Sequence, residues 1–329
     1  MRLRLVQVLH RHGDRSPLHN VFAGVPWRAS KEDALWAPKL HAPSTGVYGQ
    51  LTTLGVDQMR ARGAQLRDQC LSQGWTLRDE LMDLKVLSTP YDRTQQSVLA
   101  LLSRLAPHAA TMNDVHVLPR HLNFINAYSA NGDVIIPLKM QLIADHPEYA
   151  KDDARVEPLK QELVHRLPMF REGGEAFTWM KAADHFICRD AHALEYLPET
   201  KELAKPTIDH LSLRFQQYYT DPVILRLVAT GLVTELLDQM EQSMAGGATH
   251  VKEAIRIYSG HDVSLLALLY ALDTSLVQPF WPDYSAAVVL ELHQDGTDWL
   301  VRVTLDNEVV VPLMPFPVFA SALRQKTTH

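Results

Sequence analysis

Residues 11 to 17 read Arg11-His12-Gly13-Asp14-Arg15-Ser16-Pro17, directly after an apolar run over residues 3 to 9 that predicts a buried strand. The seven residues therefore fall in the loop where that strand ends. Arginine offers planar, permanently charged forks that match phosphate oxygens, and histidine can be a neutral nucleophile near neutral pH. Gly13 lets the backbone approach a neighbour closely or take a positive φ. The segment predicts a phosphate site; the alternative is a surface loop with two solvated arginines and an unrelated histidine.

A second segment of the same kind lies far along the chain. Residues 254 to 258 alternate like a strand and lead into Ser259-Gly260-His261-Asp262, which an apolar helical stretch follows. A strand again delivers titratable groups at its carboxyl end. The alternative is that Asp262 only caps the helix, as aspartate often does, beside a structural histidine.

A third segment repeats the arrangement after the apolar residues Leu84, Val86 and Leu87, and it reads Ser88-Thr89-Pro90-Tyr91-Asp92-Arg93-Thr94. Thr89 as N-cap and Pro90 at the first helical position predict a helix start. Arg93 then lies in the first turn, where the helix dipole favours anions rather than cations. Its presence there indicates an anionic partner, which is either Asp92 or a bound phosphate.

All three segments combine a strand, a polar loop and a helix. In open α/β sheets, ligands bind outside the carboxyl ends of the strands. The sequence therefore predicts an α/β fold with histidine and arginine side chains at one edge of the sheet, although it does not by itself place the three strand ends side by side.

On these residues the chain resembles the histidine acid phosphatase family, the larger branch of the histidine phosphatase superfamily. Further support comes from Gly49-Gln50-Leu51-Thr52 with Leu54-Gly55 and Gln58, and from Pro282, Tyr284 and Glu291 before Val301-Arg302-Val303. The resemblance implies a phosphoglycerate-mutase-like open sheet core flanked by helices, with an inserted, mostly helical cap subdomain. It also implies an acid phosphatase of the kind that includes the lysophosphatidic acid phosphatases.

The positions of the motifs predict the domain layout. Residues 1–120 and 247–329 form the predicted α/β catalytic core, and residues 121–246 form the predicted helical cap, which holds no catalytic motif. Such a cap would set substrate preference. Near the end of the chain, Asp295-Gly296 predicts a hairpin between strands at residues 287–292 and 299–304.

The mechanism implied by the resemblance begins with attack of His12 on phosphorus, which gives a phosphohistidine. Asp262 would protonate the leaving alkoxide and then act as base on water. We expect an acidic pH optimum, because Asp262 must be protonated first and a crowded phosphate dianion favours that form. Neither a metal nor another cofactor is needed. The phosphate oxygens would be bound by four side chains: Arg11, Arg15, Arg93 and His261.

Three further residues are interpreted from their positions in the motifs. Asp14 either orients Arg11 or Arg15 or caps a turn. His10 precedes the motif on the strand and is interpreted as structural. His121, with Pro119, resembles a P-x-H segment of the family and is a candidate residue of the pocket wall.

Other functions must be weighed against this one. A phosphoglycerate-mutase-like phosphoryl transferase shares the Arg-His-Gly nucleophile, but that branch lacks the ending Arg15-Ser16-Pro17 and tends to be shorter. A catalytically weak phospho-ligand-binding module would be expected to have lost His12 or Asp262. A phytase differs only in substrate and needs many basic residues around the cap, and residues 120 to 246 show no obvious basic cluster.

Composition narrows the class of protein and of partner. The 329 residues are 46% hydrophobic and 21% charged, as is ordinary for a globular chain, and the net charge of −6 argues against nucleic acid or an anionic membrane as main partner. We expect a small phosphomonoester as substrate and no integral membrane segment, because no apolar stretch is long enough to span a bilayer. The 16 histidines show no metal-ligand spacing. The oligomeric state and the physiological substrate (a lysophospholipid, a sugar phosphate, a nucleotide or a phosphotyrosine) are not predicted.

Only two cysteines are present, Cys70 and Cys188. Secreted members of the family typically carry several disulfides, which this chain cannot form, and the first strand begins almost at Met1. We therefore expect a reducing, cytoplasmic location, although a chain from which a leader had been removed would begin in the same way. Cys70 lies on an apolar helical stripe and is expected to be buried.

Overall fold

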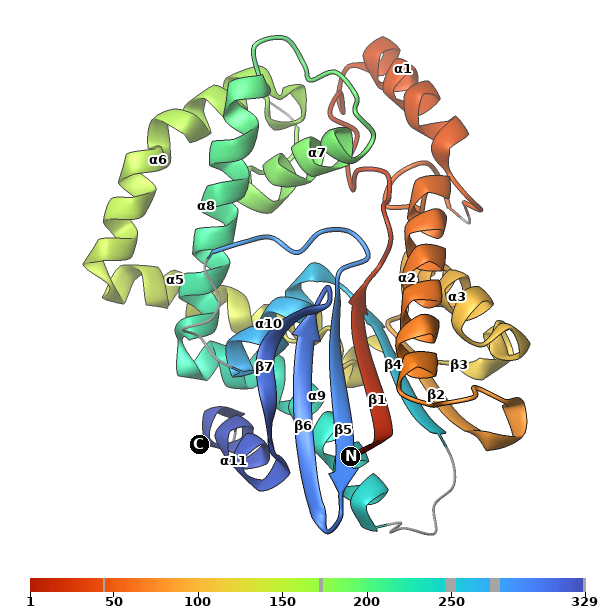
Figure 1. The fold of residues 1–329 in the computed structure, drawn as a ribbon. Helices are drawn as coiled ribbons and strands as arrows, with labels where there is room; N and C mark the ends of the chain where they lie inside the picture. The colour runs from red at the N-terminus through yellow and green to blue at the C-terminus, as the bar shows by residue number, and fades with distance from the viewer. Residues whose placement is uncertain (44, 172–173, 246–252, 273–278, 328–329) are drawn as a thin grey trace.

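The computed structural model describes residues 1–43, 45–171, 174–245, 253–272 and 279–327, and a twisted sheet lies at its centre (Figure 1). Within these residues the sheet has seven strands in the order β3-β2-β4-β1-β5-β6-β7. The strands are β1 (Arg2–Arg11), β2 (Met82–Ser88), β3 (Val115–Val117), β4 (Glu253–Gly260), β5 (Ala287–Asp295), β6 (Asp298–Leu305) and β7 (Glu308–Pro315). β1, β2, β3 and β4 are parallel, whereas β5, β6 and β7 join antiparallel beyond β1.

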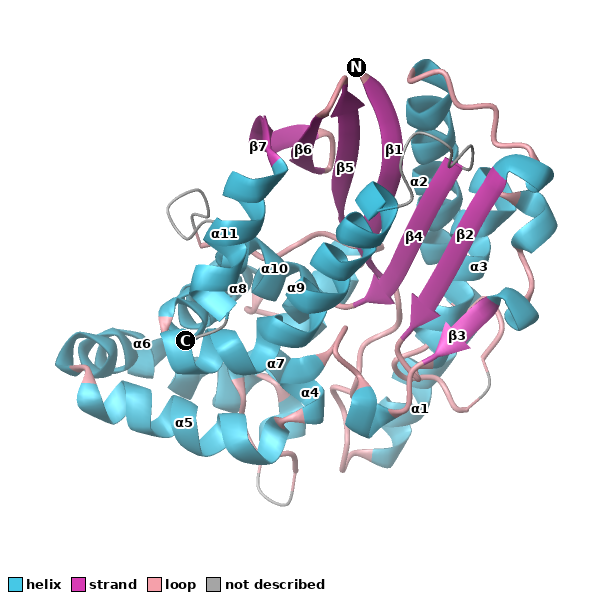
Figure 2. Ribbon diagram, turned by 90° about the horizontal axis from the view of Figure 1, so that it is seen from below, coloured by secondary structure: helices cyan, strands magenta, loops and turns pink. Residues whose placement is uncertain are grey.

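Helices cover both faces of the sheet (Figure 2). On one face lie α2 (Thr53–Ser72) and α3 (Asp92–Leu105), and on the other lie α9 (Pro222–Ala245), α10 (Asp262–Leu272) and α11 (Phe316–Thr327). The side chains of β1 explain the two layers. Val6 and Val8 pack into the cluster below α2 and α3, while Leu5 and Leu9 pack into the cluster below α9 and α10. The predicted α/β sheet flanked by helices is confirmed.

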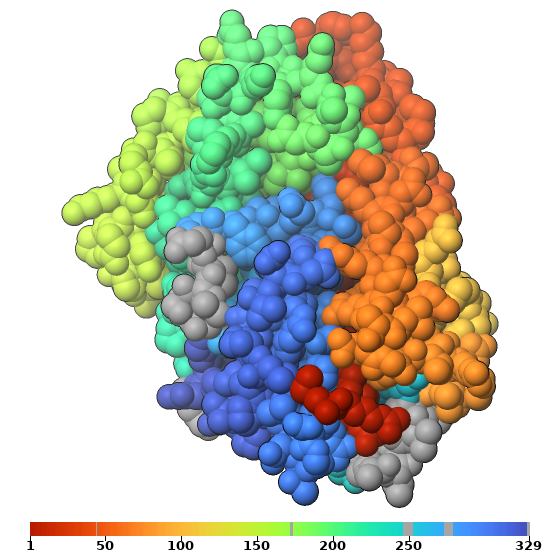
Figure 3. All heavy atoms as spheres, in the orientation of Figure 1, coloured from red at the N-terminus to blue at the C-terminus, as the bar shows by residue number. Residues whose placement is uncertain are grey.

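The remaining helices lie mostly beyond the carboxyl end of β1. They are α1 (Pro26–Trp36), α4 (Ala127–Ala130), α5 (Gly132–Asp145), α6 (Pro147–Arg166), α7 (Trp179–Ala191) and α8 (Lys201–Thr220). The space-filling view shows the green segment that contains α7 packed against the red segment that contains α1 at the top of the molecule (Figure 3). Segments far apart in the sequence thus form one continuous surface above the sheet.

The division of the chain into core and cap stays a prediction. Its second boundary, between residues 246 and 247, lies outside the described residues. Before it, α9 packs on the sheet rather than over its edge, and Gln7 of β1 donates a hydrogen bond of 3.1 Å to the carbonyl of Leu236 in α9.

Two local predictions can be compared with the structure. The hairpin is confirmed, because β5 and β6 meet at Asp295-Gly296, where Gly296 has a φ of 61°. The helix start at Thr89 and Pro90 is wrong: α3 begins at Asp92 after the extended residue Tyr91. The Thr89 hydroxyl is bonded to the Thr94 hydroxyl at 2.8 Å, so it does not cap the helix.

Both cysteines are buried as free thiols, as predicted for Cys70. Within the described residues, no helix has the length and apolar character needed to cross a bilayer. The reducing compartment stays a prediction.

Candidate active site

The three polar segments meet at one edge of the sheet. In the register of β1 with β4, Arg11 lies opposite Gly260, and in the register of β2 with β4, Ser88 lies opposite Ser259. Since these strands are parallel, their carboxyl ends lie together, and each strand is followed there by its polar loop. The ends of β1, β2 and β4, which the sequence could not place side by side, are therefore adjacent in the structure.

Close contact with α2 fixes the loop that follows β1. A Cβ on Gly13 would lie 2.3 Å from the carbonyl oxygen of Gly55, and a Cβ on Gly55 would lie 2.2 Å from that of Asp14. Thr52, the N-cap of α2, donates its backbone N–H to the Asp14 carbonyl at 3.0 Å. Gly13 is not among the described glycines with positive φ. Of the two reasons expected for this glycine, close approach is the one the structure supports.

His12 is buried with its ring held by the loop itself. Nδ1 lies 2.8 Å from the carbonyl oxygen of Gly13. A carbonyl can only accept a hydrogen bond, so Nδ1 carries the proton and Nε2 keeps its lone pair. Burial, followed by the positive charges of Arg93 and Arg11, holds the pKa of His12 well below its usual value of 6.5. The imidazole is therefore neutral and nucleophilic even at mildly acidic pH.

Arg11 links the first and second segments. Its Nη2 forms an ion pair of 2.9 Å with Asp262 at the start of α10. Its Nη1 donates to the carbonyl of Pro282 at 2.5 Å, and its guanidinium lies 4.2 Å from the ring centroid of Tyr284. Three groups thus fix this arginine beside Asp262, whose side chain is 14% exposed and so can reach a ligand.

Arg15 is held from the opposite side, by α7. Its Nη2 pairs with Asp184 at 2.6 Å, and both side chains are 6% exposed. Asp184 also accepts the backbone N–H of Leu18 at 2.7 Å. Cys188, one turn further along α7, lies 3.7 Å from Arg15, and burial raises the pKa of its thiol, so this cysteine is inert rather than a thiolate.

Arg93 occupies the first turn of α3, as predicted, with its guanidinium 4.5 Å from the centroid of the Tyr91 ring. Burial and the neighbouring charge of Arg15 lower the pKa of Arg93 to about 10. In the described part of the chain, the Nε atoms of Arg11, Arg15 and Arg93 are buried without a hydrogen-bond partner. Three crowded guanidiniums with unused donors form a site that a dianion would stabilise.

His261, the residue between β4 and α10, completes the cluster. Its ring centroid lies 5.5 Å from that of His12 and 5.1 Å from that of Tyr91. Nε2 lies 3.0 Å from the hydroxyl of Thr89, which explains why Thr89 is needed outside the helix. Burial, followed by the charges of Arg93 and Arg15, holds the pKa of His261 well below 6.5.

Asp14 has other partners than the arginines. Its carboxylate accepts hydrogen bonds from the Thr52 hydroxyl at 2.5 Å and from Nε2 of His192 at 2.6 Å. Of the two alternatives for Asp14, direct pairing with Arg11 or Arg15 is not seen among the described residues, where those two guanidiniums are paired with Asp262 and Asp184.

The two other histidines of uncertain role lie in different surroundings. His10 is fully buried on β1, as a structural residue would be, and burial lowers its pKa to about 4. His121 is exposed in a short 3₁₀ turn, Arg120–Leu122, and its place in the pocket wall stays a prediction.

Sequence reasoning missed Asp184 and His192, which reach the loop from α7 and from the residue after it. One signal was available. Asp184 interrupts the run Ala182, Ala183, Phe186 and Cys188, all of which are buried, and a carboxylate on an apolar helix face requires a cationic partner.

Comparison with known proteins identifies a family and several relatives that are similar in sequence. A model of the histidine phosphatase superfamily, branch 2, matches residues 2–167 and 169–306. Counting factor 60 of Dictyostelium discoideum is 26% identical over 336 aligned residues, which cover 90% of this chain and 77% of that protein. Prostatic acid phosphatase of Bos taurus is 24% identical, covering 93% and 78%. Lysophosphatidic acid phosphatase type 6 of Bos taurus is 23% identical, covering 95% and 79%.

Solved structures share the fold. The phytase of Klebsiella sp. ASR1 superposes with a TM-score of 0.66 at 15% identity, covering 99% of this chain and 96% of that one. The Hafnia alvei phytase in complex with myo-inositol hexakis sulphate gives a TM-score of 0.66 at 14% identity, covering 99% and 97%. At this identity the likeness establishes the architecture of the sheet and its helices.

Proposed function

Because the chain belongs to branch 2 of the histidine phosphatase superfamily, we propose that it hydrolyses phosphomonoesters through a covalent phosphohistidine on His12. The observation that carries the proposal is the buried imidazole of His12, held through Nδ1 by the Gly13 carbonyl and grouped with Arg11, Arg15 and Arg93, whose Nε atoms have no partner among the described residues. Such a site offers a nucleophile and a receptor for its negatively charged target in the same place.

In the first step Nε2 of His12 attacks phosphorus and the ester P–O bond breaks. The bonding electrons go to the departing oxygen, which takes a proton from Asp262. The three arginines bind the equatorial oxygens, where negative charge is spread in the transition state. Arg11 is the link between the two halves of this step, since it pairs with Asp262 at 2.9 Å and would also hold the phosphate.

In the second step Asp262 removes a proton from water, the water oxygen attacks phosphorus, and the P–N bond breaks. Orthophosphate leaves and His12 returns to its neutral form. A pH optimum on the acidic side follows, because Asp262 must carry a proton in the first step while His12 stays neutral at the same pH. No step requires a metal.

The relatives support different substrates for the same chemistry. One sequence relative is a lysophosphatidic acid phosphatase, and the structural neighbours are phytases. We propose an acid phosphatase acting on a small phosphomonoester, with the lysophospholipid as the first substrate to test, since sequence identity to that relative is the higher of the two.

The test is an assay of orthophosphate release between pH 4 and pH 8. Lysophosphatidate, a sugar phosphate, a nucleotide, phosphotyrosine and phytate are compared, each with and without chelator. We expect hydrolysis that is fastest at acidic pH and unaffected by chelator. Phosphoryl transfer between phosphoglycerates without release of orthophosphate would identify a mutase instead.

A further inference from the structure

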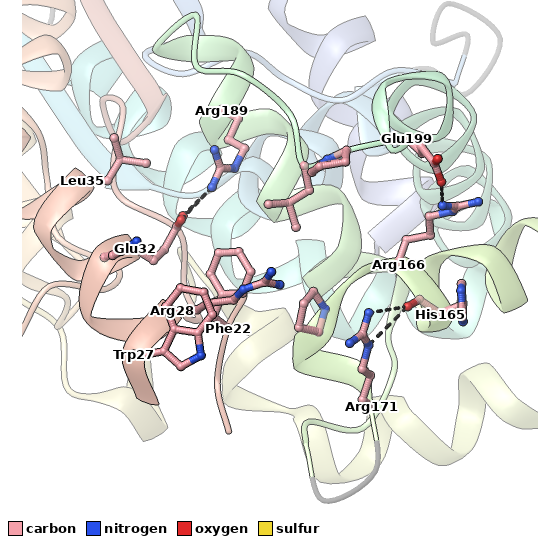
Figure 4. Close-up of a pocket in the computed structure, with 14 residues that line it drawn as sticks. Phe22, Trp27, Arg28, Glu32, Leu35, His165, Arg166, Arg171, Arg189 and Glu199 are labelled. Carbon is pink, nitrogen blue, oxygen red and sulfur yellow. Dashed lines mark hydrogen bonds and ion pairs between the residues drawn. The ribbon is translucent and has the colours of Figure 1, made fainter. Parts of the chain in front are cut away.

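A cavity of about 680 Å³ lies between α1 and the chain that runs from the end of α6 through the turn η6 (Pro168–Phe170) (Figure 4). This volume is in the usual range for small-molecule sites. None of the residues that line it belongs to the cluster around His12. Its apolar wall includes Phe22, Trp27, Leu35 and Leu197.

The charged residues of the cavity do not balance. Five cationic side chains and two carboxylates line it, which leaves a formal charge of +3 in a chain whose net charge is −6. Glu32 is bound by Arg189 at 2.7 and 2.8 Å, and Glu199 is bound by Arg166. Both carboxylates are thus neutralised by arginines of the same cavity (Figure 4).

Three cations remain, and the structure holds them at the cavity without an acidic partner among the described residues. Arg28 and Lys31 lie 5.1 Å from the ring centroid of Trp27, and Arg28 lies 5.5 Å from that of Phe22. On the opposite wall, Arg171 donates to the carbonyl of His165 at 3.1 and 3.3 Å. All three side chains are exposed, and these neutral partners lie beside the cations without supplying a negative charge from the described residues.

Trp27 is 61% exposed, although a tryptophan normally packs against other side chains. An exposed indole beside two cations and an open cavity presents both an apolar face and positive charge to a ligand. A ligand with an apolar body and an anionic head would cover the ring and neutralise Arg28, Lys31 and Arg171 together.

We propose that this cavity is a second binding site, separate from the phosphate cluster, for a small anion with an aromatic or aliphatic body. Carboxylate, sulfonate and phosphate head groups share the necessary chemistry. The proposal does not depend on the catalytic assignment, because it uses no residue of the phosphate cluster.

The probe is 8-anilinonaphthalene-1-sulfonate, an aromatic sulfonate whose fluorescence rises on binding, titrated into the full chain. We expect one saturable site. The double variant R28Q/K31Q should weaken binding by about tenfold or more, the loss of two charge-assisted contacts. The matched control is R60Q/K205Q, which removes two cations from exposed surface pairs elsewhere and should leave binding unchanged. Leu35→Trp, which fills the cavity, should also reduce binding.

Two further experiments test where the probe binds and which part of the ligand is recognised. Arg93→Ala should leave binding unchanged, because Arg93 belongs to the phosphate cluster. Displacement of the probe by hexanoate, by phenyl phosphate and by inorganic phosphate separates the apolar body from the head group, and inorganic phosphate should be the weakest competitor. Equal weakening by R28Q/K31Q and by the control, or loss of binding in Arg93→Ala, would overturn the proposal.

Discussion

Arg15, in the loop after β1, forms a 2.6 Å ion pair with Asp184 of α7. Arg15, one of the predicted phosphate-binding residues, is thus held by a helix that is distant in the sequence. The same carboxylate accepts the backbone N–H of Leu18, which lies 166 positions before Asp184. The pair ties α7 to the catalytic loop, so that the position of Arg15 depends on how α7 packs.

Asp184→Asn should therefore impair catalysis without removing any group that touches phosphate. We expect kcat/KM to fall by roughly tenfold to a hundredfold, because a displaced Arg15 no longer meets the phosphate oxygens. Inhibition by inorganic phosphate should weaken as well, a change that partial unfolding alone would not produce. Asp190→Asn, an exposed position on the same helix, is the control. Unchanged phosphate inhibition would mean that Asp184 serves only the fold.

Arg93→Ala should cost on the order of 2 to 4 kcal/mol in transition-state stabilisation, as for the loss of one oxyanion donor. Arg93→Lys should recover part of this, because it restores the charge but not the planar fork. The measurement is kcat/KM of each variant, calculated per molecule of folded protein. An early-melting variant with wild-type kinetics per folded molecule would instead make Arg93 a structural partner of Asp92.

Asp262→Asn should affect substrates with poor leaving groups most. An alkyl phosphate needs a proton on its departing oxygen, whereas p-nitrophenolate leaves almost unaided. The rate ratio of aryl to alkyl ester should therefore rise strongly, and the preference for acidic pH should weaken. If both substrates slow by the same factor while the phosphoenzyme still forms, the donor is another carboxylate.

Buried histidines predict how stability depends on pH. Burial lowers the pKa of His10 to about 4 and that of His185 to about 3, against about 6.5 in the unfolded chain. Below pH 6.5 the unfolded state therefore binds protons at these histidines that the folded state does not bind. The free energy of unfolding falls as the pH falls toward 4. Each histidine should contribute a loss on the order of 2 to 3 kcal/mol over that interval.

The measurement is the unfolding free energy from denaturant titrations between pH 7 and pH 4. Replacing one such histidine, as in His185→Leu, should make the curve flatter than that of the wild type, whatever its effect at pH 7. An unchanged slope would mean that His185 is protonated in the folded protein. Inorganic phosphate should offset part of the loss by binding the folded state.

How far the sequence predicts this molecule depends on the range of the interactions concerned. The ends of β1, β2 and β4 were recognisable because each strand, loop and helix lies within a short stretch of chain. The wrong start of α3 shows the limit of local rules: Thr89 is a residue type that often caps helices, but its hydroxyl lies 3.0 Å from Nε2 of His261, which follows β4. No local pattern contains that contact.

The role of His192 and the cavity beside α1 depend on contacts of the same long-range kind, whereas for Asp184 the apolar helix face around it indicates a cationic partner without identifying Arg15. Arg28 and Lys31 belong to α1, whereas Arg171 follows α6. Residues 120 to 246 contain only part of this group of charges, because two distant segments of the chain assemble it. Such sites appear only when the packing of α1 against the helices above the sheet is known.

The most direct test of the account is to trap the phosphoenzyme. Wild-type protein is mixed with labelled p-nitrophenyl phosphate, quenched within milliseconds, and analysed for protein-bound phosphate beside His12→Ala and the exposed control His116→Ala. We predict an acid-labile, base-stable phosphohistidine in the wild type and in His116→Ala. His12→Ala should form none and retain less than roughly a thousandth of the activity. Activity above that level in His12→Ala, or label on a different residue, would contradict the assignment of His12 as the nucleophile.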